Sequence, residues 1–124
     1  MGSSNKKGAT GKNLDILYPT GYNIDAIEVR ETDVFIKWMK SLKDRTARPI
    51  INERIRRLSL GNKGDSEPVG VGVSELRIDY CPGYRVYYTQ VRGKIIILLC
   101  GGDKTTQQKD IEKARKIALF YKEK

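Results

Sequence analysis

The sequence predicts one α+β domain, in which a hairpin of two helices covers one face of a small, mostly antiparallel sheet. A chain of 124 residues is long enough for one hydrophobic core but not for two. Period-two alternation marks a strand ahead of two amphipathic helical segments, and a meander of three strands and a last helix follow. The predicted order of elements is therefore β-α-α-β-β-β-α.

The first part of the chain shows no clear element. Residues 1–13, MGSSNKKGATGKN, contain almost nothing apolar, so burial cannot offset the entropy lost on ordering. Residues 14–24 surround a Pro-Thr-Gly turn signal with apolar residues, which leaves a short hairpin or a docked arm open. We predict that residues 1–24 are a flexible extension or a remnant of an expression vector, and that residues 25–124 form the folded domain.

Hydrophobic periodicity predicts the strand and both helices of the first half. In AIEVRE, residues 26–31, apolar and charged residues alternate as in a half-buried strand. Residues 32–43 place apolar side chains on one helical face at i, i+3, i+4 and i+7. A second helix is predicted over 46–60, because its apolar residues recur at helical spacing and Gly61 suits the position after a helix.

The second half begins with a predicted loop over 61–72, after which three strands form the meander. SELRID (74–79) and YRVYYTQV (84–91) alternate apolar and polar residues, whereas KIIILLC (94–100) is apolar on both faces, as in a central strand. The core is expected to form between the strands and the helical hairpin. Its predicted buried members are Phe35, Met39, Ile51, Ile55, Leu58, Ile78, Val86, Ile97 and Leu99.

A glycine pair follows the apolar strand. Gly101 and Gly102 match neither a P-loop nor a dinucleotide-binding fingerprint, and we interpret them as a turn at the exit of the strand. The last helix is expected to begin near Thr105, because Thr105 and Gln108 have the spacing of a capping box.

Composition limits the classes of function. The chain has 24 Lys and Arg against 15 Asp and Glu, a formal net charge of +9, which favours a polyanionic partner such as nucleic acid, a ribonucleoprotein or an acidic protein. A merely basic protein is the equal alternative. Two cysteines and no histidine provide neither a disulfide framework nor a zinc cluster, and the longest apolar run is far shorter than the ~20 residues of a membrane span. We therefore expect a reduced, cytoplasmic protein without metal or cofactor.

Five polar residues of the meander and its exit loop are expected to meet at one end of the sheet. The set comprises Arg77, Arg85, Tyr87, Asp103 and Lys104. Guanidinium groups bind phosphate oxygens bidentately, and a phenol stacks on a base or donates a hydrogen bond. The alternative is a solvated polar face with cross-strand ion pairs, such as Glu75 or Asp79 with Arg85, and the residues leave both interpretations open.

Two segments carry a resemblance to a known family. The stretches ELRIDYCPGYRVYYTQ, residues 75–90, and IIILLCGGDKTTQQKDIEKA, residues 95–114, together with the order of elements, resemble the RelE/ParE toxin superfamily. More narrowly, they are similar to HigB-type addiction module killer proteins, which have LRI-x-x-GPGYRVY and L-x-GGDKSSQ-x-x-DI-x-x-A motifs. The resemblance covers about residues 25–121, and Cys81 stands where a glycine is usual before Pro-Gly.

The resemblance implies a RelE-like fold and the toxin of a type II toxin-antitoxin module. Such toxins cut mRNA in the ribosome by metal-independent attack of the 2′-OH on the neighbouring phosphate. Carried onto this sequence, Arg77 and Arg85 would clamp the phosphate, Lys104 would transfer a proton, and Tyr87 would stack on or orient the nucleotide. Because histidine is absent, lysine, tyrosine and carboxylates are the remaining proton carriers.

Further site residues and partners follow from the same resemblance. Asp103 and two arginines of the second helix, Arg54 and Arg57, are assigned to RNA binding, with a solvated helix face as the alternative for the arginines. The expected partners are a cognate antitoxin, the ribosome and mRNA, and the toxin alone is expected to be a monomer without membrane contact. Two other functions stay open, namely a ParE-like non-enzymatic inhibitor of DNA gyrase and a non-catalytic RNA-binding module.

Overall fold

The computed structural model describes residues 26–122, and the predicted extension over residues 1–24 lies outside the described residues. The elements follow the expected order with two additions, an edge strand and a short 3₁₀ helix. They are β1 (Glu28–Glu31), α1 (Asp33–Ser41), α2 (Ala47–Ser59), β2 (Ser66–Gly70), β3 (Val73–Arg77), β4 (Tyr84–Val91), β5 (Ile95–Asp103), the short 3₁₀ helix η1 (Lys104–Thr106) and α3 (Gln107–Lys122). Among these elements, no helix combines the length and apolar composition needed to cross a bilayer.

The strands form one five-stranded sheet in the order β1-β5-β4-β3-β2. Only β1 pairs in parallel, with β5, and the other three pairings are antiparallel. The predicted α+β class with a mostly antiparallel sheet is confirmed. The predicted loop over 61–72 is wrong in part, because Ser66–Gly70 pairs with β3 as an edge strand. Its sequence, SEPVG, has little hydrophobic alternation, and its proline is tolerated because the strand lies at the edge.

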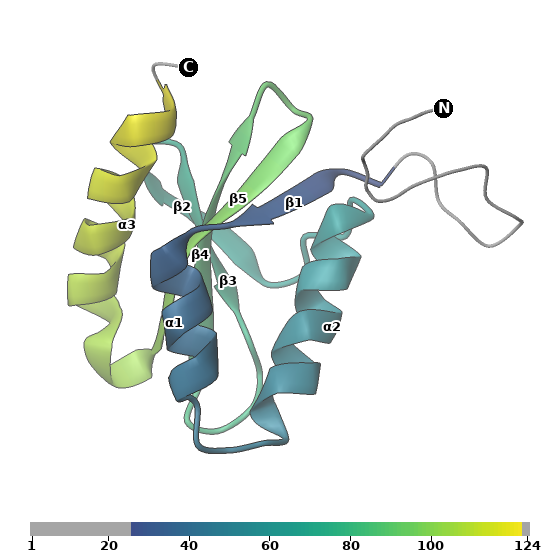
Figure 1. Ribbon diagram of the computed structural model, residues 1–124, viewed down its shortest axis with the longest axis vertical. Coiled ribbons are helices and arrows are strands. Elements are labelled where there is room, and N and C mark those ends of the chain that lie inside the picture. Colours follow the sequence, from purple (N-terminus) through teal and green to yellow (C-terminus); the bar gives the residue numbers. More distant parts are fainter. Residues whose placement is uncertain (1–25, 123–124) are drawn as a thin grey trace, which may run out of the picture.

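Helices cover both faces of the sheet (Figure 1). The predicted hairpin of α1 and α2 packs on one face, where Phe35, Ile51 and Leu58 meet Val86 and Leu98 in one hydrophobic cluster. The other face was expected to be open and polar, and this expectation is wrong because α3 covers it. A second cluster lies beneath α3 and is formed by Val73, Tyr87, Ile97, Leu99, Cys100, Ile111, Ala114 and Ala118.

Burial of the predicted core is confirmed with two refinements. Eight of the nine predicted residues are buried, whereas Met39 is only partly buried against the first cluster. Ile97 and Leu99 face α3 rather than the helical hairpin. The strand β5 therefore contributes to both clusters, as its two apolar faces predict.

Candidate functional site

A buried carboxylate, Glu75 of β3, joins the predicted site residues. Glu75 is 1% exposed. Its Oε1 accepts hydrogen bonds from Nε of Arg77 at 3.1 Å and from Nη1 of Arg85 at 3.2 Å. Its Oε2 accepts from the Tyr87 hydroxyl at 2.9 Å and from Nε2 of Gln107 at 2.8 Å. Four donors from β3, β4 and α3 thus converge on one side chain, and we call these five residues the Glu75 cluster.

The surroundings keep Glu75 ionised. Burial acts to raise the pKa of this carboxyl, but hydrogen bonds from Gln107 and Tyr87 and the positive charge of Arg85 outweigh it, so the pKa lies below its usual range. Burial and the neighbouring carboxylate raise the pKa of the Tyr87 phenol, which therefore keeps its proton and serves as a donor. Tyr87 is 0% exposed, so its predicted position on an open polar face is wrong.

The two arginines of the cluster differ in how fully they are paired. Arg77 contacts three carboxylates: Asp65 at 3.1 Å, Glu67, and Glu75. The hydrogen bond that Arg77 donates to Glu67 is the largest cause of the raised pKa of Arg77. Arg85 pairs only with Glu75, its side chain is 13% exposed, and its buried Nε has no hydrogen-bond partner in the described structure. Arg85 is therefore the less fully paired of the two arginines, and the expected alternative, a cross-strand pair of Arg85 with Glu75, is also present.

The end of β5 supplies Asp103 and Lys104. Asp103 accepts from the backbone N–H of Thr105 at 2.8 Å and from its hydroxyl at 2.6 Å, and these bonds lower the pKa of Asp103. Asp103 and Thr106 form the capping box, so the predicted Thr105–Gln108 box is wrong. Lys104 is exposed and makes no hydrogen bond or ion pair with any described residue. Lys104 lies two residues after Gly102, and Gly102 is opposite Arg85 in the register of β4 and β5. Arg85 and Lys104 therefore lie at the same end of the sheet.

The glycine pair lies inside β5 rather than in a turn, so the predicted exit turn is wrong. Gly101 is opposite Val86, and Gly102 is opposite Arg85. A Cβ at Gly101 would overlap the indole ring of Trp38. A Cβ at Gly102 would overlap the Asp110 carboxylate on the other face, 2.7 Å from its Cγ. Both glycines are explained by the close approach of a helix on each side of the strand.

In the described structure, neither Arg54 nor Arg57 of α2 forms an ion pair with a residue of the Glu75 cluster. Nη1 of Arg54 donates to the backbone oxygen of Arg77 at 3.2 Å, and its guanidinium lies against Gly64. Arg54 therefore holds the C-terminal end of β3 through a hydrogen bond to its backbone. Arg57 is exposed and pairs with Glu53 at 3.1 Å. Their assignment to RNA binding stays a prediction.

Three residues of interest were not predicted as site residues. Glu75, which was considered only as an ion-pair partner of Arg85, and Gln107 complete the cluster. Tyr80 lies partly exposed before the β3–β4 turn, stacked on Tyr84 with ring centroids 6.4 Å apart. The signal available for Glu75 was the alternation in β3, which places Glu75 and Arg77 on one side. Gln107 and Tyr80 had no such signal, because their hydrogen-bond partners, Glu75 and Asp44, lie 32 and 36 residues away in the sequence.

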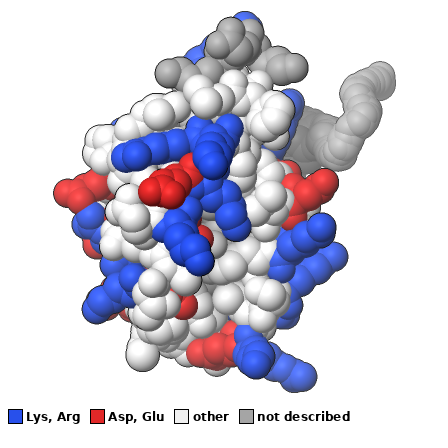
Figure 2. Space-filling model, turned by 90° about the vertical axis from the view of Figure 1, so that its left-hand side faces the viewer, with Lys and Arg blue, Asp and Glu red and all other residues white. Residues whose placement is uncertain are grey.

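The face of the molecule that α3 covers is basic. Figure 2 looks onto the face that α3 presents, where basic side chains gather around an acidic one in its upper half. Helix α3 contributes exposed lysines at helical spacing to this face, Lys109, Lys113 and Lys116. Such a stripe is the usual electrostatic footprint of a polyanion-binding surface.

Comparisons with known proteins agree with this fold. The family model described as Phage derived protein Gp49-like (DUF891) matches residues 37–119. A protein of Haemophilus influenzae described as uncharacterized is 49% identical over 92 residues, which cover 74% of this chain and 93% of that protein. The E. coli toxin RelE, solved as a mutant in the free state, superposes with a TM-score of 0.60 at 13% identity, over 73% of this chain and 94% of RelE.

Proposed function

Because the chain belongs to the Gp49-like family and has the fold of RelE, we propose that it is the toxin of a type II toxin-antitoxin module. The resemblance to the RelE/ParE superfamily is confirmed by family and fold together, whereas membership of the HigB-type group stays a prediction. Within the proposal, the toxin is an endoribonuclease that cuts mRNA on the ribosome. The partner that neutralises it is a cognate antitoxin.

The observation that carries the proposal is the pairing state of Arg85. Among the described residues its guanidinium pairs with Glu75 alone, which fixes its orientation, and an unpaired ammonium, that of Lys104, lies at the same end of the sheet. When the 2′-oxygen attacks phosphorus, its proton passes to a water molecule, negative charge grows on the phosphorane oxygens, and a positioned arginine stabilises that charge. The bond from phosphorus to the 5′-oxygen then breaks, and Lys104 donates the proton that this oxygen requires. The products are a 2′,3′-cyclic phosphate and a 5′-hydroxyl.

The remaining site residues take modified roles in the proposal. Arg77 acts as a second clamp only when phosphate displaces its exposed partners Asp65 and Glu67, which are 61% and 60% exposed and so bind weakly in water. Tyr87 positions Glu75 from within the core instead of stacking on a nucleotide. The stacking role passes to Tyr80, whose ring is partly exposed at the same end of the sheet.

Inhibition of DNA gyrase without catalysis is the second candidate. It is favoured by charge compensation at Arg77, because three carboxylates surround a guanidinium that a nuclease would leave free for phosphate. A gyrase inhibitor needs a basic interaction surface but no reactive constellation. This candidate predicts that loss of Arg85 leaves toxicity intact.

Mapping of transcript ends in induced cells distinguishes these functions. Cells would express the wild type, Arg85→Ala or Arg56→Ala, the last being a matched loss of an exposed arginine that has no assigned role at the site. We expect new 5′-hydroxyl ends within translated codons for the wild type and Arg56→Ala, and none for Arg85→Ala. Unchanged transcripts together with relaxed plasmid DNA would reject the nuclease in favour of gyrase inhibition.

A further inference from the structure

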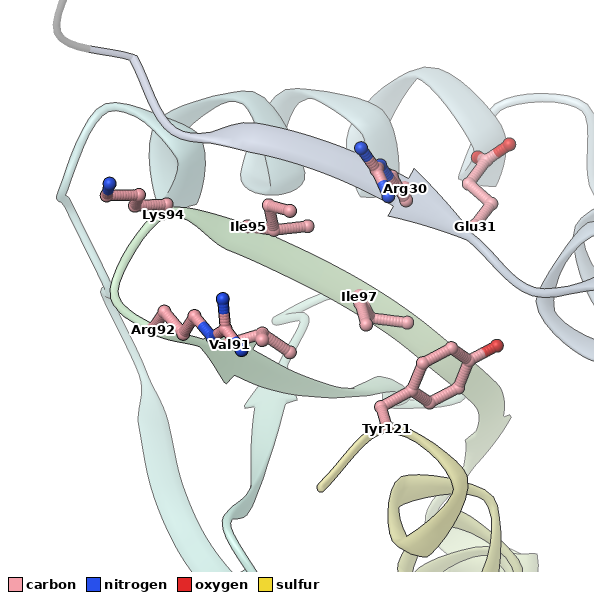
Figure 3. Close-up of a pocket in the computed structure, with 8 residues that line it drawn as sticks. All are labelled: Arg30, Glu31, Val91, Arg92, Lys94, Ile95, Ile97 and Tyr121. Carbon is pink, nitrogen blue, oxygen red and sulfur yellow. The ribbon is translucent and has the colours of Figure 1, made fainter. Parts of the chain in front are cut away.

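A groove lies at the opposite end of the sheet from the Glu75 cluster. It has a volume of about 580 Å³ and opens between β1, the β4–β5 turn and the C-terminal end of α3 (Figure 3). Its apolar wall consists of Val91, Ile95, Ile97 and Tyr121. These residues belong to the α3 face of the sheet, so α3 leaves part of that face, over β5 and β1, without a helix on top.

Cations surround the apolar wall. Arg30 of β1 and Arg92 and Lys94 of the β4–β5 turn line the same groove, together with one acidic residue, Glu31. The ammonium of Lys94 is exposed and makes no ion pair with the described residues, and Arg30 pairs with Glu28, which is itself 56% exposed. The rim is therefore positive, and the charges of Lys94 and Arg30 are available to a bound molecule.

The groove is well separated from the proposed reacting end. Val91 is opposite Ile95 in the register of β4 and β5, whereas Arg85 is opposite Gly102. Six residues of β4 separate the two levels, and at ~3.3 Å per strand residue this is roughly 20 Å. A molecule in the groove does not need to contact Arg85.

The chemistry of the groove favours a segment of protein over RNA. Its wall is mainly aliphatic and offers one aromatic ring, whereas single-stranded RNA is held by aromatic rings on which bases stack. Aliphatic side chains in a groove ringed by cations match an amphipathic segment with an apolar face and acidic flanks. Phe120, which is 73% exposed beside Tyr121 in sequence, adds apolar surface at the same end of α3.

We propose that this groove anchors an acidic, apolar-faced segment of the cognate antitoxin. The inference rests on the proposed toxin function. The segment places apolar side chains against Ile95, Ile97 and Tyr121 and carboxylates beside Arg30 and Lys94. Anchoring occurs about 20 Å from Arg85, so antitoxin binding and RNA cleavage depend on different residues of the toxin.

Charge reversal at the rim tests the proposal. Lys94→Glu alone and together with Arg30→Glu would be compared with the wild type and with Lys37→Glu, an equal charge change on the exposed side of α1 across the sheet. The probe is the purified antitoxin, defined as the product of the neighbouring gene that restores growth to cells expressing the toxin. Lys94 is an exposed turn residue, so the single variant is expected to fold, and its Tm would be measured to check this.

We expect the double variant to bind antitoxin at least about tenfold more weakly than wild type, because it loses at least one charge contact that is shielded from water in the complex. Lys37→Glu should bind like wild type, and all variants should cut mRNA alike without antitoxin. The proposal would be overturned if the double variant bound antitoxin within twofold of the wild-type affinity, or if it lost mRNA cleavage. It would also be overturned if the wild type were a dimer and the double variant a monomer, because the groove would then bind a second copy of the chain. If the wild type proves non-toxic, the proposed function itself fails, which is a separate outcome.

Discussion

Replacing Glu75 by glutamine removes one negative charge from the centre of the Glu75 cluster and almost no volume. In the wild type, one carboxylate accepts four hydrogen bonds. An amide has one accepting oxygen and one donating nitrogen. If the oxygen faces Arg77 and Arg85, the nitrogen faces the donors of Tyr87 and Gln107, which must reorient.

The cost can be worked from these contacts. Hydrogen bonds to a charged group contribute about 1.5–3 kcal/mol each, and removing one partner of a buried ion pair costs about 3–5 kcal/mol. Arg77 keeps Asp65 and Glu67, and Arg85 is 13% exposed, so water and other partners recover part of the loss. We therefore expect Glu75→Gln to lower the free energy of unfolding by about 2–4 kcal/mol, or the Tm by roughly 10–20 °C.

The pH dependence gives the sharper assay. The pKa of Glu75 is lowered in the folded state, so its contribution is complete above the unfolded pKa of about 4.3 and is lost as pH falls through the folded pKa. The Tm difference between wild type and Glu75→Gln should be largest near neutral pH and shrink below about pH 4. The control is Glu53→Gln, which removes the charge of an exposed carboxylate that pairs with Arg56 on α2. A difference that is small at neutral pH, or that persists unchanged in acid, would refute the reasoning.

Three further predictions concern packing, charge and proton transfer. Gly102→Ala should destabilise the fold by about 1–3 kcal/mol because its Cβ overlaps Asp110, and denaturant unfolding should show that Gly102→Ala/Asp110→Ala costs less than the sum of the single changes. Binding to ribosomes should weaken steeply as salt rises, because a chain of net charge +9 releases counterions from RNA; an association constant that stays flat would point to an apolar contact. Lys104→Arg keeps the charge but cannot give up its proton, so mRNA cleavage should fall by about 10²–10⁴, and a wild-type rate would reduce Lys104 to an electrostatic contact.

Periodicity predicted most of the fold because most elements bury one regular face. The strand Tyr84–Val91 and the helices α1 and α2 have the predicted bounds to within two residues. The strand β2 was missed because SEPVG, which pairs with β3 at the edge of the sheet, has little hydrophobic alternation. The glycine pair was assigned to a turn because the ring and the carboxylate that exclude a Cβ come from α1 and α3.

The candidate site was predictable as a set of residues but not as an arrangement. Alternation correctly grouped Arg77, Arg85 and Tyr87 on one side of the sheet. It could not tell that α3 covers Tyr87 or that Glu75 holds both arginines, since those facts depend on how a helix some 30 residues away docks. The difference between a fully paired Arg77 and an underpaired Arg85 also arises from β2, whose strand character was not foreseen.

The most direct test of the central claim is the single-turnover rate at which Arg85→Ala cleaves mRNA on programmed ribosomes. Arg56→Ala serves as the control, because Arg56 is an exposed arginine of α2 with no assigned role at the site, and circular dichroism verifies that both variants are folded. If Arg85 stabilises the charge on the phosphorane, the rate should fall by about 10²–10³ while Arg56→Ala cleaves like wild type. A folded Arg85→Ala protein that cleaves at the wild-type rate would contradict the account.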